Sequence, residues 1–250
     1  MLKEMLNDLT KSFMKTDCKT IVCHPSPEGN LRVSSVTDDA QLYIYAESVE
    51  TGWDKKEFAF RDWTSVASII STFNSTDGFE LKLESNEEDY PYLMKAKSKH
   101  MSMTHYLQNY TFISRQDDLL KTYKGKKFTL KSLDQNYMPN FNANTMSEIS
   151  KLASLTGEKS FRVKKEGNDL YFCFADETKT IDNGKVKVEE NYQLPFTDKG
   201  LFFNVEYLGI AVNSLKDQDM KIKFDGGMIT VCGGNDVSKK VIAIVGKKDS

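Results

Sequence analysis

Long apolar runs are absent from this sequence of 250 residues, of which 39% are hydrophobic and 28% are charged. No segment approaches the roughly 18 consecutive apolar residues that a membrane-spanning helix needs. The opening segment MLKEMLNDLTKSF is amphipathic, and charges at Lys3, Glu4 and Asp8 interrupt any apolar stretch of the kind found in signal peptides. The sequence therefore predicts a cytoplasmic protein with no membrane partner.

Cysteine and histidine are scarce and scattered. The four cysteines stand at positions 18, 23, 173 and 232 with no CxxC pair, which predicts small packed side chains rather than a disulfide framework or a zinc site. His100 and His105 are five residues apart, so an extended strand would place them on opposite faces. We predict no metal site.

Catalytic and phosphate-binding motifs are also absent. The chain contains no GxSxG, Walker loop, HExxH or GxGxxG. The Gly226-Gly227 and Gly233-Gly234 pairs are typical of turns, and the acidic run at residues 87–89 is typical of a solvated turn rather than of a spaced acid–base pair. We therefore predict that the protein is not an enzyme and binds no cofactor.

A four-fold repeat is the most informative feature that is present. Segments with the pattern strand, polar turn, strand begin at residues 20, 79, 161 and 220, so the offset is 59 residues within each half and 141 between halves. Each follows a segment of helical character. The segments are Thr20–Thr37, Phe79–Ser98, Phe161–Ala175 and Met220–Gly233. Because a domain usually has about 100 to 150 residues, the chain is predicted to form two domains with two units each.

Apolar residues at three- and four-residue spacing predict the helices. Their outward positions hold small polar and basic residues, and the few acids there are Glu4, Asp8, Glu148 and Glu206. The predicted helices are Leu2–Phe13, Trp63–Phe73 with Asp62 as N-cap, Asn144–Leu155 with Gly157 as stop, and Val205–Lys216.

Strand patterns fill much of the remaining chain, which favours an α+β fold of antiparallel sheets covered by helices on one face. Residues 107–125 fit no repeat unit and are predicted to connect the two domains. The further predicted strands are Gln41–Glu47, Glu57–Phe60, Tyr90–Lys99, Lys126–Leu130, Lys185–Phe196 and Val241–Val245.

The order of these units resembles the DNA sliding clamps, and within them the two-domain clamps of T4-type bacteriophages. The resemblance covers nearly the whole chain and is strongest in Phe128–Leu133, the helix that follows, FRVKKEGNDLYFCFA and LFFNVEYLGIAVNSLKDQDMKIKFDGGMITVCGG. It implies a DNA-clamp fold with domains at residues 1–108 and 127–250, a connector at 109–126, and a location in the host-cell cytoplasm if the protein is viral.

A ring is what the resemblance implies for assembly. Sliding clamps close six similar domains around duplex DNA, so a two-domain chain implies a homotrimer with helices lining the hole and sheets outside. Pairing of sheet edges between copies would also protect strands that otherwise invite aggregation. The implied function is to encircle DNA without sequence preference and to tether the replicative polymerase, which confers processivity.

Basic residues on the helices are the candidates for facing DNA, because phosphates are held by Lys and Arg through attraction that is independent of sequence. The alternative is that these are ordinary solvated lysines. The net charge of −2 favours neither reading, because its distribution decides how DNA is attracted. The candidates are Lys3, Lys11, Lys15, Arg61, Lys151 and Lys216.

A pocket for short peptide motifs of the polymerase and the clamp loader is also implied, beside the connector and the C-terminal tail. The apolar pair Leu119-Leu120 in a polar linker supports this, although it could instead anchor the linker to its own domain. The candidate pocket residues are Val36, Leu119, Leu120, Tyr123 and Ile244.

Two other readings stay open. The chain could be a monomeric clamp-like processivity or transcription accessory factor that binds DNA without encircling it, which stronger basicity would have favoured. It could also be a structural β-rich protein with no DNA partner.

Overall fold

A computed structural model describes residues 1–13, 16–18, 20–109, 138–174, 183–215, 218–225 and 227–248. The chain divides into two compact units. Unit 1 comprises Met1–Asp38, Ile44–Thr129 and Gly234–Lys240, and unit 2 comprises Asp39–Tyr43, Leu130–Gly233 and Val241–Ser250. The predicted connector lies outside the described residues except for Asn109, so the predicted domain boundaries stay a prediction.

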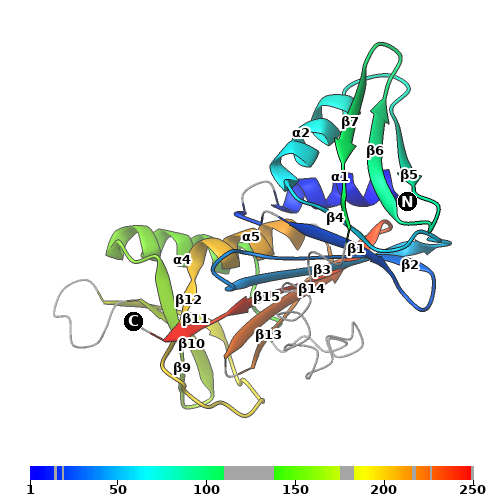
Figure 1. Ribbon diagram of the computed structural model, residues 1–250. Helices are drawn as coiled ribbons and strands as arrows, with labels where there is room; N and C mark the ends of the chain where they lie inside the picture. The colour runs from blue at the N-terminus through cyan, green and yellow to red at the C-terminus, as the bar shows by residue number, and fades with distance from the viewer. Residues whose placement is uncertain are drawn as a thin grey trace. The chain divides into compact units, whose positions relative to one another are not determined.

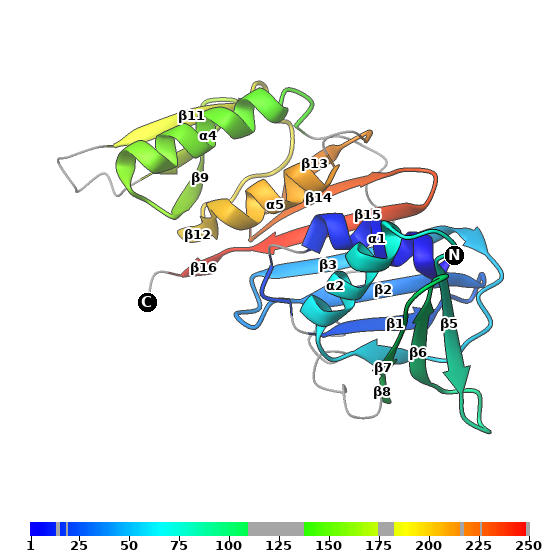
Figure 2. The same cartoon turned by 90° about the horizontal axis from the view of Figure 1, so that it is seen from above.

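Unit 1 holds helices α1 (Leu2–Phe13) and α2 (Trp63–Asn74), which pack against each other. Its strands form one sheet in the order β8-β4-β1-β2-β3 and a second in the order β5-β6-β7 (Figures 1 and 2). The strands are β1 (Ile21–Pro25), β2 (Asn30–Val36), β3 (Leu42–Thr51), β4 (Phe58–Phe60), β5 (Glu80–Ser85), β6 (Pro91–Lys97), β7 (Ser102–Tyr106) and β8 (Gln108–Asn109).

Unit 2 repeats this plan with helices α4 (Ala143–Thr156) and α5 (Val205–Leu215), which lie side by side over a sheet of order β11-β10-β9-β12-β16 (Figure 2). A further set of strands has the order β13-β14-β15. The strands are β9 (Ser160–Glu166), β10 (Asp169–Phe174), β11 (Gly184–Glu189), β12 (Leu201–Asn204), β13 (Lys221–Asp225), β14 (Met228–Gly234), β15 (Ser238–Val245) and β16 (Lys247–Lys248). The first residues of β3 belong to unit 2 and those of β15 to unit 1.

The predicted four-fold repeat is confirmed as four antiparallel hairpins: β1–β2, β5–β6, β9–β10 and β13–β14. Each comes after a helix in the chain, as the sequence predicted. The predicted α+β class with antiparallel sheets is therefore confirmed.

Local sequence sets where the helices begin and end. The Asp62 carboxylate accepts hydrogen bonds from the backbone N–H and the hydroxyl of Ser65, at 3.2 and 2.5 Å, so it caps α2. Asn142 caps α4 and forms a capping box with Thr145. Gly157 ends α4 in the left-handed conformation with a φ of 71°, which an L side chain rarely adopts.

Alternation along the strands builds the core of unit 2. The buried residues of β9, β10 and β12 are mostly phenylalanines, joined by Val163 and Leu170, and the Phe161 ring stacks on Phe172 with centroids 4.3 Å apart. Phe174 and Phe203 lie 5.9 and 5.8 Å from the same ring. This aromatic cluster supports the sheet beneath the two helices, because such ring pairs stabilise beyond their buried area.

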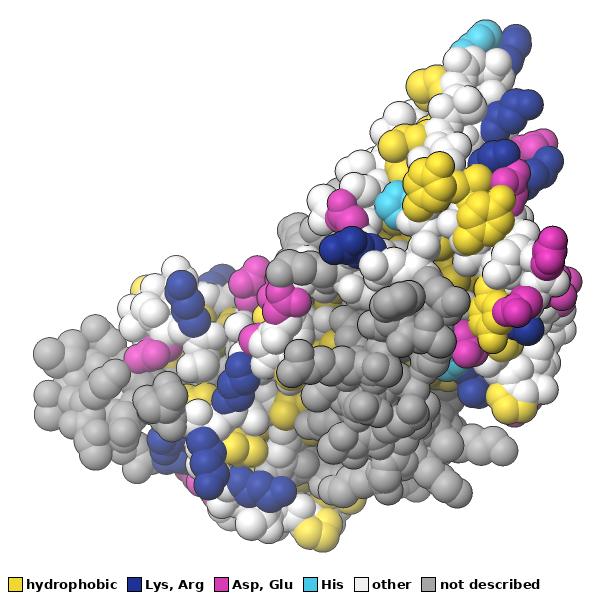
Figure 3. Space-filling view, in the orientation of Figure 1, with side chains coloured by type: hydrophobic (Ala, Val, Ile, Leu, Met, Phe, Trp, Pro, Cys, Tyr) yellow, Lys and Arg dark blue, Asp and Glu magenta, His cyan; other side chains and the backbone are white. Residues whose placement is uncertain are grey.

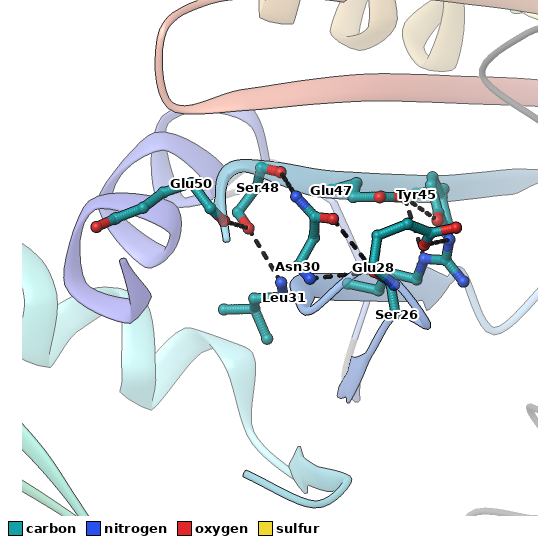
Figure 4. A network of polar contacts seen from close by, with 9 residues as sticks. Ser26, Glu28, Asn30, Leu31, Tyr45, Glu47, Ser48 and Glu50 are labelled. Carbon is teal, nitrogen blue, oxygen red and sulfur yellow. Dashed lines mark hydrogen bonds and ion pairs between the residues drawn. The ribbon is translucent and has the colours of Figure 1, made fainter. Parts of the chain in front are cut away.

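A polar network fixes the β1–β2 turn against β3 (Figure 4). The Ser26 hydroxyl accepts from the backbone N–H groups of Glu28 and Asn30, at 3.1 and 3.0 Å. The Asn30 amide donates to the Ser48 carbonyl at 2.8 Å, and the Ser48 hydroxyl accepts from the Leu31 N–H at 3.0 Å. These buried groups satisfy one another, which holds the turn in a single arrangement.

One predicted strand is shorter in the structure, and some strands of the structure were not predicted. The strand expected over Lys185–Phe196 ends at Glu189, because Asn191 adopts a left-handed φ of 55° that breaks the extended run. The strand expected over Lys126–Leu130 lies outside the described residues. Strands β7, β8, β12 and β16 were not predicted. In the described ranges, no helix is long and apolar enough to cross a membrane.

We expect Asp62→Ala to lower the free energy of unfolding by about 1 kcal/mol at neutral pH, because α2 loses its cap. The hydrogen bonds from Ser65 lower the pKa of Asp62 in the folded chain. Its contribution is therefore present above the ordinary pKa of an aspartate and is lost as the pH falls through the folded value. Urea titrations of wild type and variant should differ at neutral pH and converge in acid. An equal gap at both pH values would contradict this role for Asp62.

Candidate nucleic-acid interface

The candidate interface of each unit is the outward face of its described helices, α1 and α2 in unit 1 and α4 and α5 in unit 2. Each helix buries one face against its sheet or its neighbouring helix, and its remaining positions are half-buried or exposed. A surface of short polar side chains with a few cations can hold phosphates without reading bases.

The outward face of α2 carries no charge. Its buried side is made of Trp63, Val66, Ala67, Ile69, Ile70 and Phe73. Its exposed side chains are Thr64, Ser68, Ser71, Thr72 and Asn74, as the periodicity predicted for the first four. The Asn74 amide donates to Asn7 of α1 at 2.6 Å, which ties the two helices together at their surface.

The two charged side chains in the first turn of α1 each have a partner within unit 1. The Lys3 ammonium donates to the Phe79 carbonyl at 2.9 Å and lies 4.7 Å from the centre of the Phe79 ring. The Glu4 carboxylate lies 2.7 Å from the Met1 amine, and the hydrogen bond from that amine lowers the pKa of Glu4. This part of α1 therefore has no excess of negative charge.

A buried ion pair neutralises the next acid of α1. The Asp8 carboxylate lies 2.9 Å from the ammonium of Lys240, whose side chain is 1% exposed. The hydroxyl of Ser238 and the amide of Asn235 donate to the same carboxylate, at 2.5 and 3.2 Å. Asp8 was predicted to be an outward acid, but its carboxylate pairs with Lys240 and Ser238 and so links α1 to β15. Strand alternation could have found Lys240, because it shares the inward face of β15 with Ser238 and Ile242.

The helices of unit 2 carry few charges on their exposed positions. Lys151 and Glu148 are both exposed on α4, and Leu155 is 79% exposed near its end. On α5, Glu206 and Asn213 are exposed. Unlike Asp8, these two acids have no cation within ion-pair distance among the described residues.

The other predicted DNA-facing residues fall in different places. Arg61 is exposed directly before the α2 cap. Lys11 belongs to α1, but nothing is described of its side chain. Lys15 and Lys216 lie outside the described residues. The role of all six candidates in DNA binding stays a prediction.

Two of the predicted peptide-pocket residues are described. Val36 of β2 is 4% exposed and Ile244 of β15 is 0% exposed, so their side chains contribute to the core and their neighbours would have to supply any binding surface. Leu119, Leu120 and Tyr123 lie outside the described residues. The pocket stays a prediction.

The four cysteines are free thiols that pack in or near the core. Cys18, Cys23 and Cys232 are buried, as predicted, and Cys173 is half-buried. Burial raises the pKa of the Cys232 thiol to about 11, and it raises the pKa of Cys23 further, so both are neutral thiols at physiological pH. In the part of the chain that the structure describes, no three His, Cys, Asp or Glu residues are grouped as metal ligands.

Comparison with solved structures shows the fold. The H. pylori β clamp in complex with diflunisal matches with a TM-score of 0.63 and 12% identity, over 98% of this chain and 64% of that chain. The A. fulgidus PCNA bound to the C-terminal region of FEN-1 matches with a TM-score of 0.62 and 11% identity, over 99% of this chain and 97% of that chain. PCNA from Entamoeba histolytica matches with a TM-score of 0.58 and 11% identity, over 98% of this chain and 96% of that chain.

The chain therefore has the fold of the sliding clamps over nearly its full length, and it spans about 64% of the H. pylori protein. No protein-family model and no curated protein sequence matches it. The finer resemblance to T4-type bacteriophage clamps stays a prediction.

We expect Lys240→Met to lower the free energy of unfolding by about 3 kcal/mol, because it leaves the Asp8 carboxylate largely buried without its cation. Adding Asp8→Leu should recover most of that loss, since an apolar pair of similar volume needs no charge compensation. Urea titrations of the wild type, both single variants and the double variant would measure this coupling. Additive losses would show that the two residues act independently.

Proposed function

We propose that this protein is a sliding clamp that encircles duplex DNA as a ring and tethers the replicative DNA polymerase, thereby conferring processivity. The observation that carries the proposal is the likeness to sliding clamps over 98 to 99% of the chain. Such a protein acts as a scaffold, so we propose no catalytic step and no cofactor. DNA replication is the process it would serve.

The helix faces would form the lining that meets DNA. A clamp has to slide, so its lining should attract phosphates and avoid contacts with base edges. In unit 1, the uncharged face of α2 and the internal neutralisation of Asp8 support this, because they leave little negative charge to repel the DNA backbone. The proposed DNA-facing residues are Lys3, Lys11, Lys15, Arg61, Lys151 and Lys216.

Self-association would close the ring. Strand β7 is an outer strand of the β5-β6-β7 sheet, and β11 is an outer strand of the five-stranded sheet. On β7, Met103 is 47% exposed and Tyr106 is 75% exposed, so this edge presents apolar surface together with open backbone groups. We propose head-to-tail pairing of β7 in one copy with β11 in the next. Three chains of two units would complete a homotrimer.

Partner proteins would dock through short peptide motifs near the connector. In the A. fulgidus PCNA structure, the bound partner is the C-terminal region of FEN-1. By analogy, we propose that a DNA polymerase and a clamp loader bind this chain at a pocket around the predicted connector. The residues proposed for it are Val36, Leu119, Leu120, Tyr123 and Ile244.

We expect light scattering across a concentration series to give a mass of three chains per particle. The same preparation should be retained on nicked circular DNA and released when the circle is linearised, because a ring can slide off an end. A strict monomer whose DNA binding ignores linearisation would favour the accessory factor that does not encircle DNA. No dependence on DNA at all would favour a structural protein.

The double variant Lys11→Glu/Lys151→Glu should weaken binding to linear duplex DNA and clamp-dependent DNA synthesis. Each lost phosphate contact lowers the slope of log affinity against log salt by about one, so the slope should fall by about two. Fluorescence anisotropy over a salt series would measure it, with unchanged solution mass as a requirement. The matched control is Lys82→Glu/Lys97→Glu, which makes the same charge change on exposed positions of β5 and β6. Equal effects in both variants would refute this assignment of the lining.

A further inference from the structure

The second face of the five-stranded sheet in unit 2 is basic. Alternation turns Phe161, Phe172, Phe174 and Phe203 inward, so the residues between them face the other side. Register places Arg162, Phe202 and the exposed Lys247 in one row across β9, β12 and β16. Lysine and arginine side chains gather over this part of the molecule at the lower left of Figure 3. The basic residues of this face are Arg162, Lys164, Lys185, Lys187 and Lys247.

The close ion pairs of this face, among the described residues, involve the lysines of β11. Lys185 lies 2.5 Å from Glu166, and Lys187 lies 2.5 Å from Glu190 and 3.6 Å from Asp169. These acids stand at or beside the turn between β9 and β10 and at the end of β11. They compensate the two lysines of β11, so the excess of positive charge lies at the other end.

The row of Arg162, Phe202 and Lys247 makes up that other end. The Arg162 guanidinium packs 4.3 Å from the centre of the Phe202 ring, and its Nε is buried with no hydrogen-bond partner among the described residues. No carboxylate in the described ranges lies within ion-pair distance of Arg162. The Lys247 ammonium is 3.9 Å from Asp39, at the limit of an ion pair. Two cations therefore flank one aromatic ring, and the long ion pair of Lys247 with Asp39 is the one counter-charge they have among the described residues.

The geometry favours a carboxylate ligand over a nucleic acid. A guanidinium that stacks on a ring keeps the edge of its planar fork available, and that edge matches a carboxylate with two parallel hydrogen bonds. Single-stranded nucleic acids need open aromatic faces on which bases stack. Here Arg162 covers Phe202, and Lys185 covers Tyr171 at 4.7 Å from the ring centre.

We propose that the row of Arg162, Phe202 and Lys247 binds an acidic peptide segment of a partner protein. Two carboxylates of an extended Asp- or Glu-rich segment would meet Arg162 and Lys247, and the aliphatic part of the segment would lie over the exposed part of Phe202. The surface lies on a sheet face rather than on the helices, so it would serve an interaction beyond the proposed DNA binding.

The test is fluorescence anisotropy with a labelled poly-glutamate peptide and the full chain, without DNA. The variant Arg162→Gln/Lys247→Gln should weaken binding at least about tenfold, because it removes the charge-assisted hydrogen bonds to both carboxylates. The control Lys82→Gln/Lys97→Gln removes the same charge from the other unit and should leave affinity unchanged. Because Arg162 also packs on Phe202, the single variant Lys247→Glu, at an exposed position, should weaken binding without affecting the fold.

Three outcomes would overturn the proposal. One is no binding of the peptide by the wild type at physiological salt. Another is an equal loss of affinity in the control variant, which would show non-specific attraction. The third is tighter binding of an oligothymidylate that competes with the peptide and is lost in the same variants, which would make this a nucleic-acid surface. None of these results depends on ring formation, so they leave the sliding-clamp proposal untouched.

Discussion

In each unit a pair of helices packs against an antiparallel sheet, α1 and α2 against β5 and β6, and α4 and α5 against β10, β11 and β12. In unit 2 the covered face is largely aromatic, with Phe161 stacked on Phe172. A helix that packs on a sheet uses one apolar stripe and leaves its other positions to solvent. Covering the sheets therefore leaves exposed helix faces whose composition can evolve independently of the core.

The helix faces of unit 1 carry little unpaired negative charge, and this has two separate causes. On α2, the sequence places only Ser, Thr and Asn at outward positions. On α1, the two acids are compensated, Glu4 by the Met1 amine and Asp8 by Lys240. A net charge of −2 for the whole chain therefore says little about the charge on these helix faces, because ion pairs within the protein neutralise some of their carboxylates.

Helices and hairpins were largely predictable because their causes are local. Apolar spacing placed all four helices to within a residue or two of their observed ends, and Asp62 and Gly157 act as the caps that their residue types indicated. The hairpins followed from repetition of one pattern. The strand over Lys185–Phe196 was predicted too long, because a backbone turn at Asn191 leaves no periodic signal in the side chains.

The sequence by itself determined the class of fold, the helices and the four hairpins, since periodicity and capping act over a few neighbouring residues. Only the tertiary structure decided which charges remain available at the surface. Lys240 compensates Asp8 from the other end of the chain, and Lys3 is held by Phe79. Likewise, only strand register placed Arg162 and Lys247 on either side of Phe202. Ion pairs and cross-strand rows depend on which distant segments meet in space, and no local pattern in the sequence records that.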